Sequence, residues 1–441
     1  MIGTLVVLAA LTAGPEAVVE ARLKNGLEVV IWPDARIPNV ALYFWYRVGS
    51  RNEAPGITGV SHFFEHMMFN GAKKYGPGEF DRVMEANGGS NNAFTSNDVT
   101  VYQDWFPKSA LPVILDLERD RIGALAIDPK MVESERQVVY SERRMRVDDD
   151  NASFLDEQIR ATAFHAHPYQ IPVIGWPSDI ESWSIEDLRR HFRTYYAPNN
   201  CTVVAVGDVD PKALLRDLER TLGKIPRQPA PRPVAVKEPV QRGVRRLQVI
   251  EDTPITILEI VWHAPAAAAP DWRRFDLLRS LLSGGESSRL HRRLVETERV
   301  ALSVSAWLDG GFDPGLFTVQ AELNEGVEPG RVEALIFEEL RLLARDGPSP
   351  DELDKVRRQS LMAYWSALET IDGKAQALGT FHTFHGGWRN LFELPKTVES
   401  ITGAEIAAAA GRLTVDKATI GVLGRAGAPP AAEPAEKDGV P

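Results

Sequence analysis

Hydrophobic positions along this chain form short strand-like runs followed by longer helical patterns, and this order occurs twice. Runs rich in β-branched and aromatic residues predict strands, and apolar residues spaced three or four apart predict helices. In the first half we predict strands at 29–32, 40–48, 100–106 and 201–206, with helices at 61–69, 111–125, 129–146 and from 184. In the second half we predict strands at 256–262, 301–308 and 315–322, with helices at 271–283, 328–345 and 349–378.

A proline-rich segment, 225–242, separates the halves and has the composition of an extended linker. A weak repeat links Ser184-Ile-Glu-Asp-Leu and the strand 202–207 to Thr402-Gly-Ala-Glu-Ile and the strand 419–424, with chance similarity as the alternative. We therefore expect an α+β fold of two similar domains, each a mostly antiparallel or mixed sheet covered by helices on one face. Their expected bounds are 16–224 and 243–425.

The two ends differ from the rest in composition. The stretch Met1–Ala13 is apolar and uncharged, too short to span a bilayer but similar to the core of a secretory signal peptide. We therefore expect a signal-like segment at 1–15 and a periplasmic or secreted protein, with an N-terminal segment that packs on the domain of a cytoplasmic protein as the alternative. Residues 426–441 are rich in proline, alanine and charge, which predicts a disordered tail.

The net charge and the cysteine content exclude several classes of function and of metal site. The chain has 50 Lys and Arg against 61 Asp and Glu, a formal net charge of −11. This balance argues against a protein whose main task is binding nucleic acid. Cys201 is the single cysteine, so an intrachain disulfide and a cysteine-based zinc cluster are excluded. Metal chemistry in this chain has to use His, Asp and Glu.

The motif His62-x-x-Glu65-His66 is the sharpest chemical feature. At about 100° per residue, the two histidines share one face of a helix, one turn apart, with the carboxylate beside them. The alternative is a core helix that carries two neutral histidines. The flanking phenylalanines and methionines would then bury three polar groups, which costs several kcal/mol when they are unpaired. A bound metal resolves that cost, so the motif predicts a metal site.

A third ligand is expected on the predicted helix that contains Glu135 and Glu142. These carboxylates lie about 20° apart around the helix axis, and Glu133 lies about 160° from Glu135. We therefore expect Glu135 and Glu142 on an apolar, inward face with Met131, Val138, Val139 and Met145. Pairing with arginine is the alternative to a role at the metal.

These spacings resemble the inverzincin metallopeptidases of the pitrilysin/insulinase family. Glu142 follows His66 by 76 positions, and Glu135 precedes Glu142 by seven. The resemblance covers most of the chain and extends to Gly59-x-Ser61-His62, Asn70-Gly71, Gly88-Gly89-x-x-Asn92-Ala93-x-Thr95 and Ser287-Ser288-Arg289-Leu290. It is closest to the short members, which include the mitochondrial processing peptidase and its bacterial relatives, and implies two domains that form one half of a clam-shell.

The resemblance also implies residue roles. His62, His66 and Glu142 would bind one Zn²⁺ per chain, Glu65 would be the general base, and Glu135 would support the site. The stretch Asn92, Ala93, Phe94 and Thr95 would be the edge strand with which a substrate backbone pairs. For Asn92, an ordinary turn residue is the alternative.

One departure from the family pattern concerns the second half. Short active members carry an arginine seven residues before a tyrosine, and the alignment places Val295 and Leu302 at these positions. Neither side chain can donate a hydrogen bond. We therefore expect a heterodimer in which a related chain supplies the missing Arg/Tyr pair, with a homodimer as the alternative.

Taken together, the sequence predicts a zinc metalloendopeptidase that acts on peptides or unfolded polypeptides. A non-catalytic scaffold or assembly subunit is the second interpretation, favoured by loss of the Arg/Tyr pair and opposed by retention of His62, Glu65, His66 and Glu142. A zinc hydrolase of non-peptide substrates is the third. Apart from the apolar N-terminal stretch, the chain offers no candidate for a membrane segment.

Overall fold

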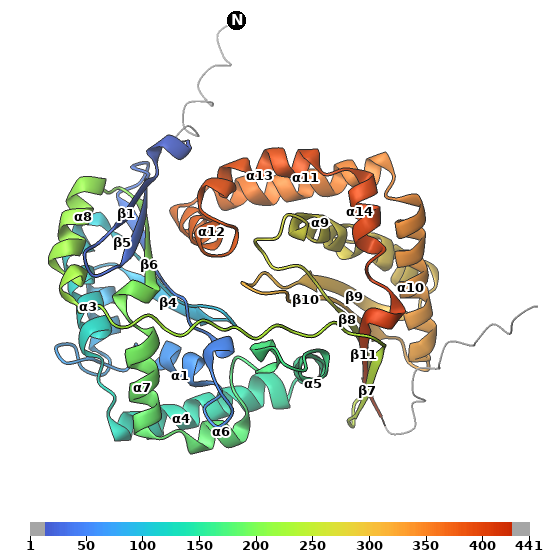
Figure 1. Ribbon diagram of the computed structural model, residues 1–441, viewed down its shortest axis with the longest axis horizontal. Coiled ribbons are helices and arrows are strands. Elements are labelled where there is room, and N and C mark those ends of the chain that lie inside the picture. Colours follow the sequence, from blue (N-terminus) through green and yellow to red (C-terminus); the bar gives the residue numbers. More distant parts are fainter. Residues whose placement is uncertain (1–13, 426–441) are drawn as a thin grey trace, which may run out of the picture. The chain divides into compact units, whose positions relative to one another are not determined.

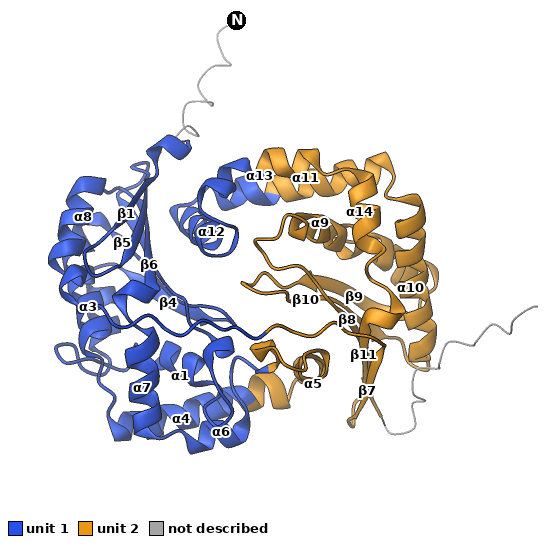
Figure 2. Cartoon of the chain, in the orientation of Figure 1, with its two compact units in different colours: residues 1–143, 171–236, 363–394 blue, residues 144–170, 237–362, 395–441 orange. Residues whose placement is uncertain are grey.

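A computed structural model describes residues 14–425 (Figure 1). The predicted signal-like start and the predicted disordered tail, 426–441, lie outside the described residues, apart from Gly14 and Pro15. The described chain divides into two compact units, one made of 14–143, 171–236 and 363–394, the other of 144–170, 237–362 and 395–425 (Figure 2). Within residues 14–425, every helix is too short or too polar to cross a membrane.

The first unit is built on a six-stranded mixed sheet. Its order is β1-β2-β6-β3-β5-β4, and only the β2–β6 pair is parallel. The central strands are apolar on both faces, since every residue of β6 is buried. A sheet with two apolar faces has to be covered on both sides. The strands are β1 (Val19–Arg22), β2 (Glu28–Pro33), β3 (Asn39–Tyr46), β4 (Ser90–Thr95), β5 (Thr100–Pro107) and β6 (Cys201–Gly207).

Seven helices build the core on one face of this sheet. On β3, alternate residues including Phe44 and Tyr46 enter this core, where they meet Phe63 and Phe64 of the first helix. The sequence prediction of helices around 61–69, 111–125 and 129–146 locates three of them to within a few residues. They are α1 (Val60–Met67), α2 (Glu79–Ala86), α3 (Leu111–Ala124), α4 (Pro129–Arg143), α6 (Pro177–Ser182), α7 (Ile185–Tyr195) and α8 (Pro211–Arg220).

The opposite face of the first sheet is covered by α12 (Ile371–Phe384), a helix from far along the chain (Figure 1). Asp372 bonds to the Tyr43 hydroxyl, and Lys374 Nζ lies 2.6 Å from Asp34 Oδ2. Midway along the helix, Gly379 packs so closely on Trp45 that a Cβ there would overlap the indole ring. A hydrogen bond, an ion pair and close packing together fix this helix on the sheet.

The second unit repeats this architecture. Its sheet order, β7-β11-β8-β10-β9, matches β2-β6-β3-β5-β4 strand for strand, with the single parallel pair in the same place. On one face, Trp262 meets Phe337 of α10; on the other, α5 packs Leu155 and Ile159 against the sheet. The elements are β7 (Arg245–Ile250), β8 (Thr256–His263), β9 (Ala301–Leu308), β10 (Leu316–Leu323), β11 (Ala418–Gly424), α5 (Asn151–Ala163), α9 (Trp272–Ser283), α10 (Pro329–Asp346) and α14 (Gly403–Ala410).

Two similar α+β domains are thus confirmed, but each sheet is covered on both faces rather than one. The compact units also differ from the division at the proline-rich linker, because 144–170 and 363–394 are exchanged between them. Each exchanged segment contains the helix that covers the second face of a sheet, α5 or α12.

The single helix expected at 349–378 is wrong. The structure has α11 (Pro350–Ala367) and then α12, because the Thr370 side chain accepts a bond from Gly373 N–H and caps a new helix. Both α11 and α13 (Arg389–Ser400) contain a boundary between the compact units.

Replacing Gly379 by alanine tests the packing of α12 on β3. Alanine favours the helix by about 1 kcal/mol over glycine, but overpacking against a buried ring costs about 1–3 kcal/mol. Because the Cβ would overlap the ring rather than touch it, we expect the upper part of this cost, so Gly379→Ala should lower the free energy of unfolding by up to about 2 kcal/mol, measured by urea denaturation. Gly76→Ala is the control, since a Cβ there meets nothing within 4 Å. Equal stability of both variants would contradict the packing.

Arg299 tests stored backbone strain. It is the only non-glycine residue between 14 and 425 with a positive φ, 52°, and its side chain is exposed. We expect Arg299→Gly to raise the free energy of unfolding by about 1 kcal/mol, because glycine adopts this conformation without steric cost. The matched variant Arg341→Gly, within α10, should lower it by about 1 kcal/mol. Changes of the same sign in both variants would refute the strain argument.

Candidate metal centre

The start of α1 is fixed by a buried carboxylate. Glu53 accepts hydrogen bonds from the backbone N–H groups of Gly59 and Ser61, each at 2.7 Å. These groups belong to the first turn of the helix, where backbone donors lack intrahelical partners. Burial raises the pKa of Glu53 to about 8, while the bonds from Ser61 and Gly59 act in the opposite direction. Glu53 therefore fixes the N-terminal end of α1 just before His62, and with it the place of the motif along the helix axis.

The back of α1 is anchored in the core. The Ser61 hydroxyl lies 3.2 Å from His191 Nε2, and the His191 ring stacks on Phe64. Burial, helped by the charge of Arg190, lowers the pKa of His191 to about 3, so this imidazole is neutral. Tyr102 donates a hydrogen bond to the Phe64 carbonyl at 2.9 Å. These contacts leave His62, Glu65 and His66 on the other side of the helix.

Glu142 of α4 faces both histidines. Its Oε2 lies 3.6 Å from His62 Nε2 and 3.3 Å from His66 Nε2. One ligand atom from each of these three residues lies within 4.8 Å of the other two. The structure thus brings together the three residues for which the sequence predicts zinc binding.

Glu135 lies beside this group and holds His66 from its other nitrogen. His66 Nδ1 donates to Glu135 Oε1 at 2.8 Å, and Asn70 Nδ2 donates to Glu135 Oε2 at 2.6 Å. A carboxylate can only accept here, so the bond places a proton on Nδ1, and Nε2 is the nitrogen that faces Glu142 and that a metal would take after losing its proton. This is how a second carboxylate orients a metal-ligating histidine.

The electrostatics of the group fit a cation. Burial alone would lower the pKa of His66, but the bonds and charges of Glu135 and Glu142 outweigh it and raise that pKa to about 9. For Glu135, burial alone would raise the pKa, but the bonds from His66 and Asn70 outweigh burial and bring the pKa below its ordinary value. Two imidazoles and one carboxylate are a donor set typical of catalytic zinc. The residues present therefore fit a zinc ion.

The inward apolar face predicted for α4 is confirmed at Met131 and Val139, which pack in the core, and is wrong at Val138 and Met145. Val132 and Val139 are buried, but Val138 is 48% exposed and Met145 is 70% exposed. The helix is covered along a narrow stripe only, and Glu142 lies at the border of that stripe. Angles around a helix axis give directions of side chains but not the width of the buried face.

Glu65 meets the end of β4. Thr95 Oγ1 donates a hydrogen bond to Glu65 Oε2 at 2.6 Å. Ala93 packs against the same core as α1, whereas Phe94 lies on the opposite face against Trp45, and Asn92 is exposed. Of the four residues predicted to bind substrate, Thr95 is thus the one whose side chain reaches the motif.

Sequence reasoning assigned no role to Glu53, or to Asn70 beyond its place in the family motif. For Asn70 a signal existed, because it follows His66 by the same four residues that separate His66 from His62, although it lies just beyond the end of α1. For Glu53 the contact is made through backbone N–H groups, which no side-chain pattern reveals.

Val295 and Leu302 lie in the second unit. Val295 belongs to the π-helical segment His291–Thr297, and Leu302 is an exposed residue of the edge strand β9.

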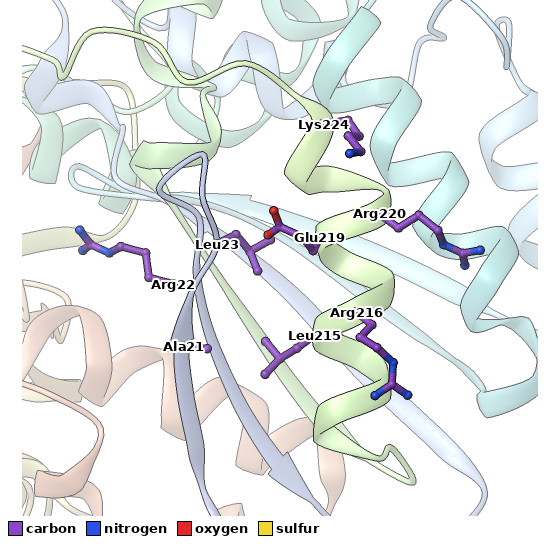
Figure 3. A pocket seen from close by; sticks show the side chains of 8 residues that line it. All are labelled: Ala21, Arg22, Leu23, Leu215, Arg216, Glu219, Arg220 and Lys224. Carbon is purple, nitrogen blue, oxygen red and sulfur yellow. The ribbon is translucent and has the colours of Figure 1, made fainter.

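A hollow of about 520 Å³ lies elsewhere in the first unit, between β1 and α8 (Figure 3). Leu23, Leu215 and Glu219 point into it, while the guanidinium groups of Arg216 and Arg220 extend away from it. Its polar groups do not converge, and we assign it no role in the chemistry.

Two family models match the chain in succession. Residues 29–176 match the model described as insulinase (peptidase family M16), and residues 182–360 match the model described as peptidase M16 inactive domain. The first match contains His62, Glu65, His66 and Glu142.

Individual relatives agree with these matches. The zinc protease PqqE of Helicobacter pylori is 32% identical over 353 residues, which cover 79% of this chain and 79% of that protein. The crystal structure of a protease from Helicobacter pylori superposes with a TM-score of 0.88 at 28% identity and covers 92% of this chain and 99% of that one. The periplasmic protease PqqL from Escherichia coli shares the fold, with a TM-score of 0.76 at 22% identity, over 94% of this chain and 48% of its own. The chain therefore belongs to the pitrilysin/insulinase family, peptidase family M16.

Proposed function

We propose that this protein is a zinc-dependent metalloendopeptidase that hydrolyses peptides or unfolded polypeptides. The observation that carries the proposal is the convergence of His62, His66 and Glu142, with Glu65 one helical turn from His62 on the same side of α1. Relatives named zinc proteases support the metal. When bound, zinc supplies the Lewis acidity that activates water near neutral pH.

In this proposal the other steps, proton transfer, orientation of a ligand and binding of the substrate backbone, are carried out by groups of the protein. Glu65 accepts the proton of the attacking water and later delivers a proton to the leaving amine. Glu135 holds His66 so that Nε2 faces Glu142. In the described part of the chain, β4 pairs only with β5, so its outer edge offers backbone groups to an extended peptide along Asn92–Thr95.

We also propose that the chain works as the zinc-bearing subunit of a dimer. The support is chemical: Val295 and Leu302 cannot donate a hydrogen bond to a substrate carbonyl, and a related chain with arginine and tyrosine at these positions would supply the donors. The fold of PqqL, of which this chain matches about half, is consistent with an enzyme built from two such chains. A homodimer is the alternative.

A non-catalytic scaffold subunit is the second candidate function. The aliphatic residues at positions 295 and 302 favour it, whereas the retained group of His62, Glu65, His66 and Glu142 opposes it. A scaffold has no need for carboxylates placed beside two partly buried imidazoles, because such groups are costly without a ligand or partner.

A location outside the cytoplasm, periplasmic or secreted, is part of the proposal. It rests on the apolar stretch Met1–Ala13 of the sequence. Sequencing the N-terminus of the protein isolated from its source decides it, since a retained Met1 would remove its support.

The role of Glu65 is tested with Glu65→Gln. Because only the base is lost, we expect zinc content to stay at one per chain and kcat to fall about 10²- to 10⁴-fold, as for the loss of a general base. Glu142→Gln should lower the zinc content itself. Glu133→Gln is the matched control, since this carboxylate of the same helix is 65% exposed. Full peptidase activity in Glu65→Gln would refute the assignment.

The dimer is tested by mixing chains. Because the Arg/Tyr pair is missing here, we expect the chain alone to cleave peptides slowly, and a related chain that carries the pair to raise kcat/KM about 10²-fold or more. A mixture made with Glu65→Gln should stay inactive, which assigns the zinc chemistry to this subunit. Cleavage at the full rate by the purified chain alone would contradict the heterodimer.

A further inference from the structure

We propose that the side chain of Thr95 is a positioning residue that holds the carboxylate of Glu65 in its reactive orientation, an inference that rests on the proposed role of Glu65 as the base. The contact is direct: the Thr95 hydroxyl donates to Glu65 Oε2 at 2.6 Å, across 30 positions of sequence. This role differs from the backbone pairing with substrate that the family resemblance implies for the same residue.

The backbone that carries the Thr95 side chain is held in place by the turn that follows it. Thr95 pairs with Thr100 across the β4–β5 hairpin, and Ser96 N–H bonds to the Val99 carbonyl at 2.8 Å. The Ser96 hydroxyl accepts bonds from the N–H groups of Asp98 and Val99, both at 3.2 Å. The turn therefore closes on itself through backbone and side-chain bonds.

The same turn is tied to the segment after β3. Arg51 and Asp98 form an ion pair at 3.0 Å whose side chains are only 10% and 4% exposed. Asn97 donates to the Ser50 hydroxyl at 2.9 Å, and the backbone of Gly49 passes so close to Ser96 that a Cβ there would overlap the Ser96 carbonyl. A side chain on a backbone held from several sides needs little rearrangement at the moment of reaction.

The register of β4 decides which side chain meets Glu65. Successive residues of a strand point to opposite faces, so Thr95 and Ala93 share the face of α1, and Phe94 points to the other. Phe94 packs edge to face on Trp45, with ring centroids 6.1 Å apart, and this contact pins the register. A slip by one residue would turn the Thr95 hydroxyl away from Glu65.

A glutamate side chain rotates freely unless its carboxylate is held. A hydrogen bond from a neutral hydroxyl to an ionised carboxylate is among the stronger bonds of its class and fixes the rotation of the acceptor. Because β4 is also the strand whose outer edge faces a substrate in the proposed function, one strand would set the position of both the base and the peptide. The distance between them then does not depend on loop movement.

The test compares Thr95→Val, which keeps the shape and removes the hydroxyl, with Thr95→Ser, which keeps the hydroxyl. We expect Thr95→Val to lower kcat about 10- to 100-fold, the effect of losing one charge-assisted hydrogen bond. We expect its KM, zinc content and melting temperature to stay at the wild-type values. Thr95→Ser should retain most of the wild-type kcat.

Three results would overturn the proposal: a wild-type kcat in Thr95→Val, a loss confined to KM, or a loss that parallels loss of zinc or of folding. An inactive Thr95→Ser that keeps its zinc and its fold would also count against it, because the hydroxyl would then not be what matters. Failure of the proposed function is seen separately, since wild-type protein loaded with zinc would show no peptidase activity, or Glu65→Gln would retain it.

Discussion

The contact between α1 and α4 through His66 is the interaction on which the site depends. A helix packed on a hydrophobic core presents two imidazoles and a carboxylate, and such groups are unfavourable at low exposure unless charge or metal compensates them. Glu135 and Glu142, from a helix about 70 residues away, provide that compensation and raise the pKa of His66 to about 9. The same contact fixes which nitrogen of His66 is available to a cation.

The surrounding structure keeps α1 where this contact needs it. Glu53 fixes the start of the helix, and His191 and Tyr102 hold its back. These contacts fix the backbone from which each functional side chain extends. The position between His62, His66 and Glu142 is where a metal ion would bind.

Most of the site was predictable from sequence because its information is local. The spacing of His62 and His66 states which residues share a helix face, and the seven-residue spacing of Glu135 and Glu142 does the same for α4. Contacts made through long-range strand register were not predictable, as with Thr95 and Glu65. The exposure of Val138 was missed because the angle around α4 does not reveal how much of the helix is covered.

The fold class followed from the order of strands and helices, but the exchange of α5 and α12 did not. Both α5 and α12 have ordinary helical patterns, and nothing in their sequences indicates which sheet each helix packs against. The second unit repeats the architecture of the first unit but not its metal-binding residues. The helix α9, which follows β8 as α1 follows β3, buries six apolar residues and contains no histidine, so the second sheet has the frame of the first without its ligands.

The position of α12 in the chain has a consequence for the order in which the protein is made. The last strand of the first sheet ends at Gly207, and α12 begins at Ile371. At roughly 5–20 residues per second, a ribosome needs about 8 to 30 s to make the intervening chain. Throughout that time the face of the sheet that carries Tyr43 and Trp45 lacks its cover. The nascent first half therefore exposes the aromatic face of its sheet until the second half is almost complete.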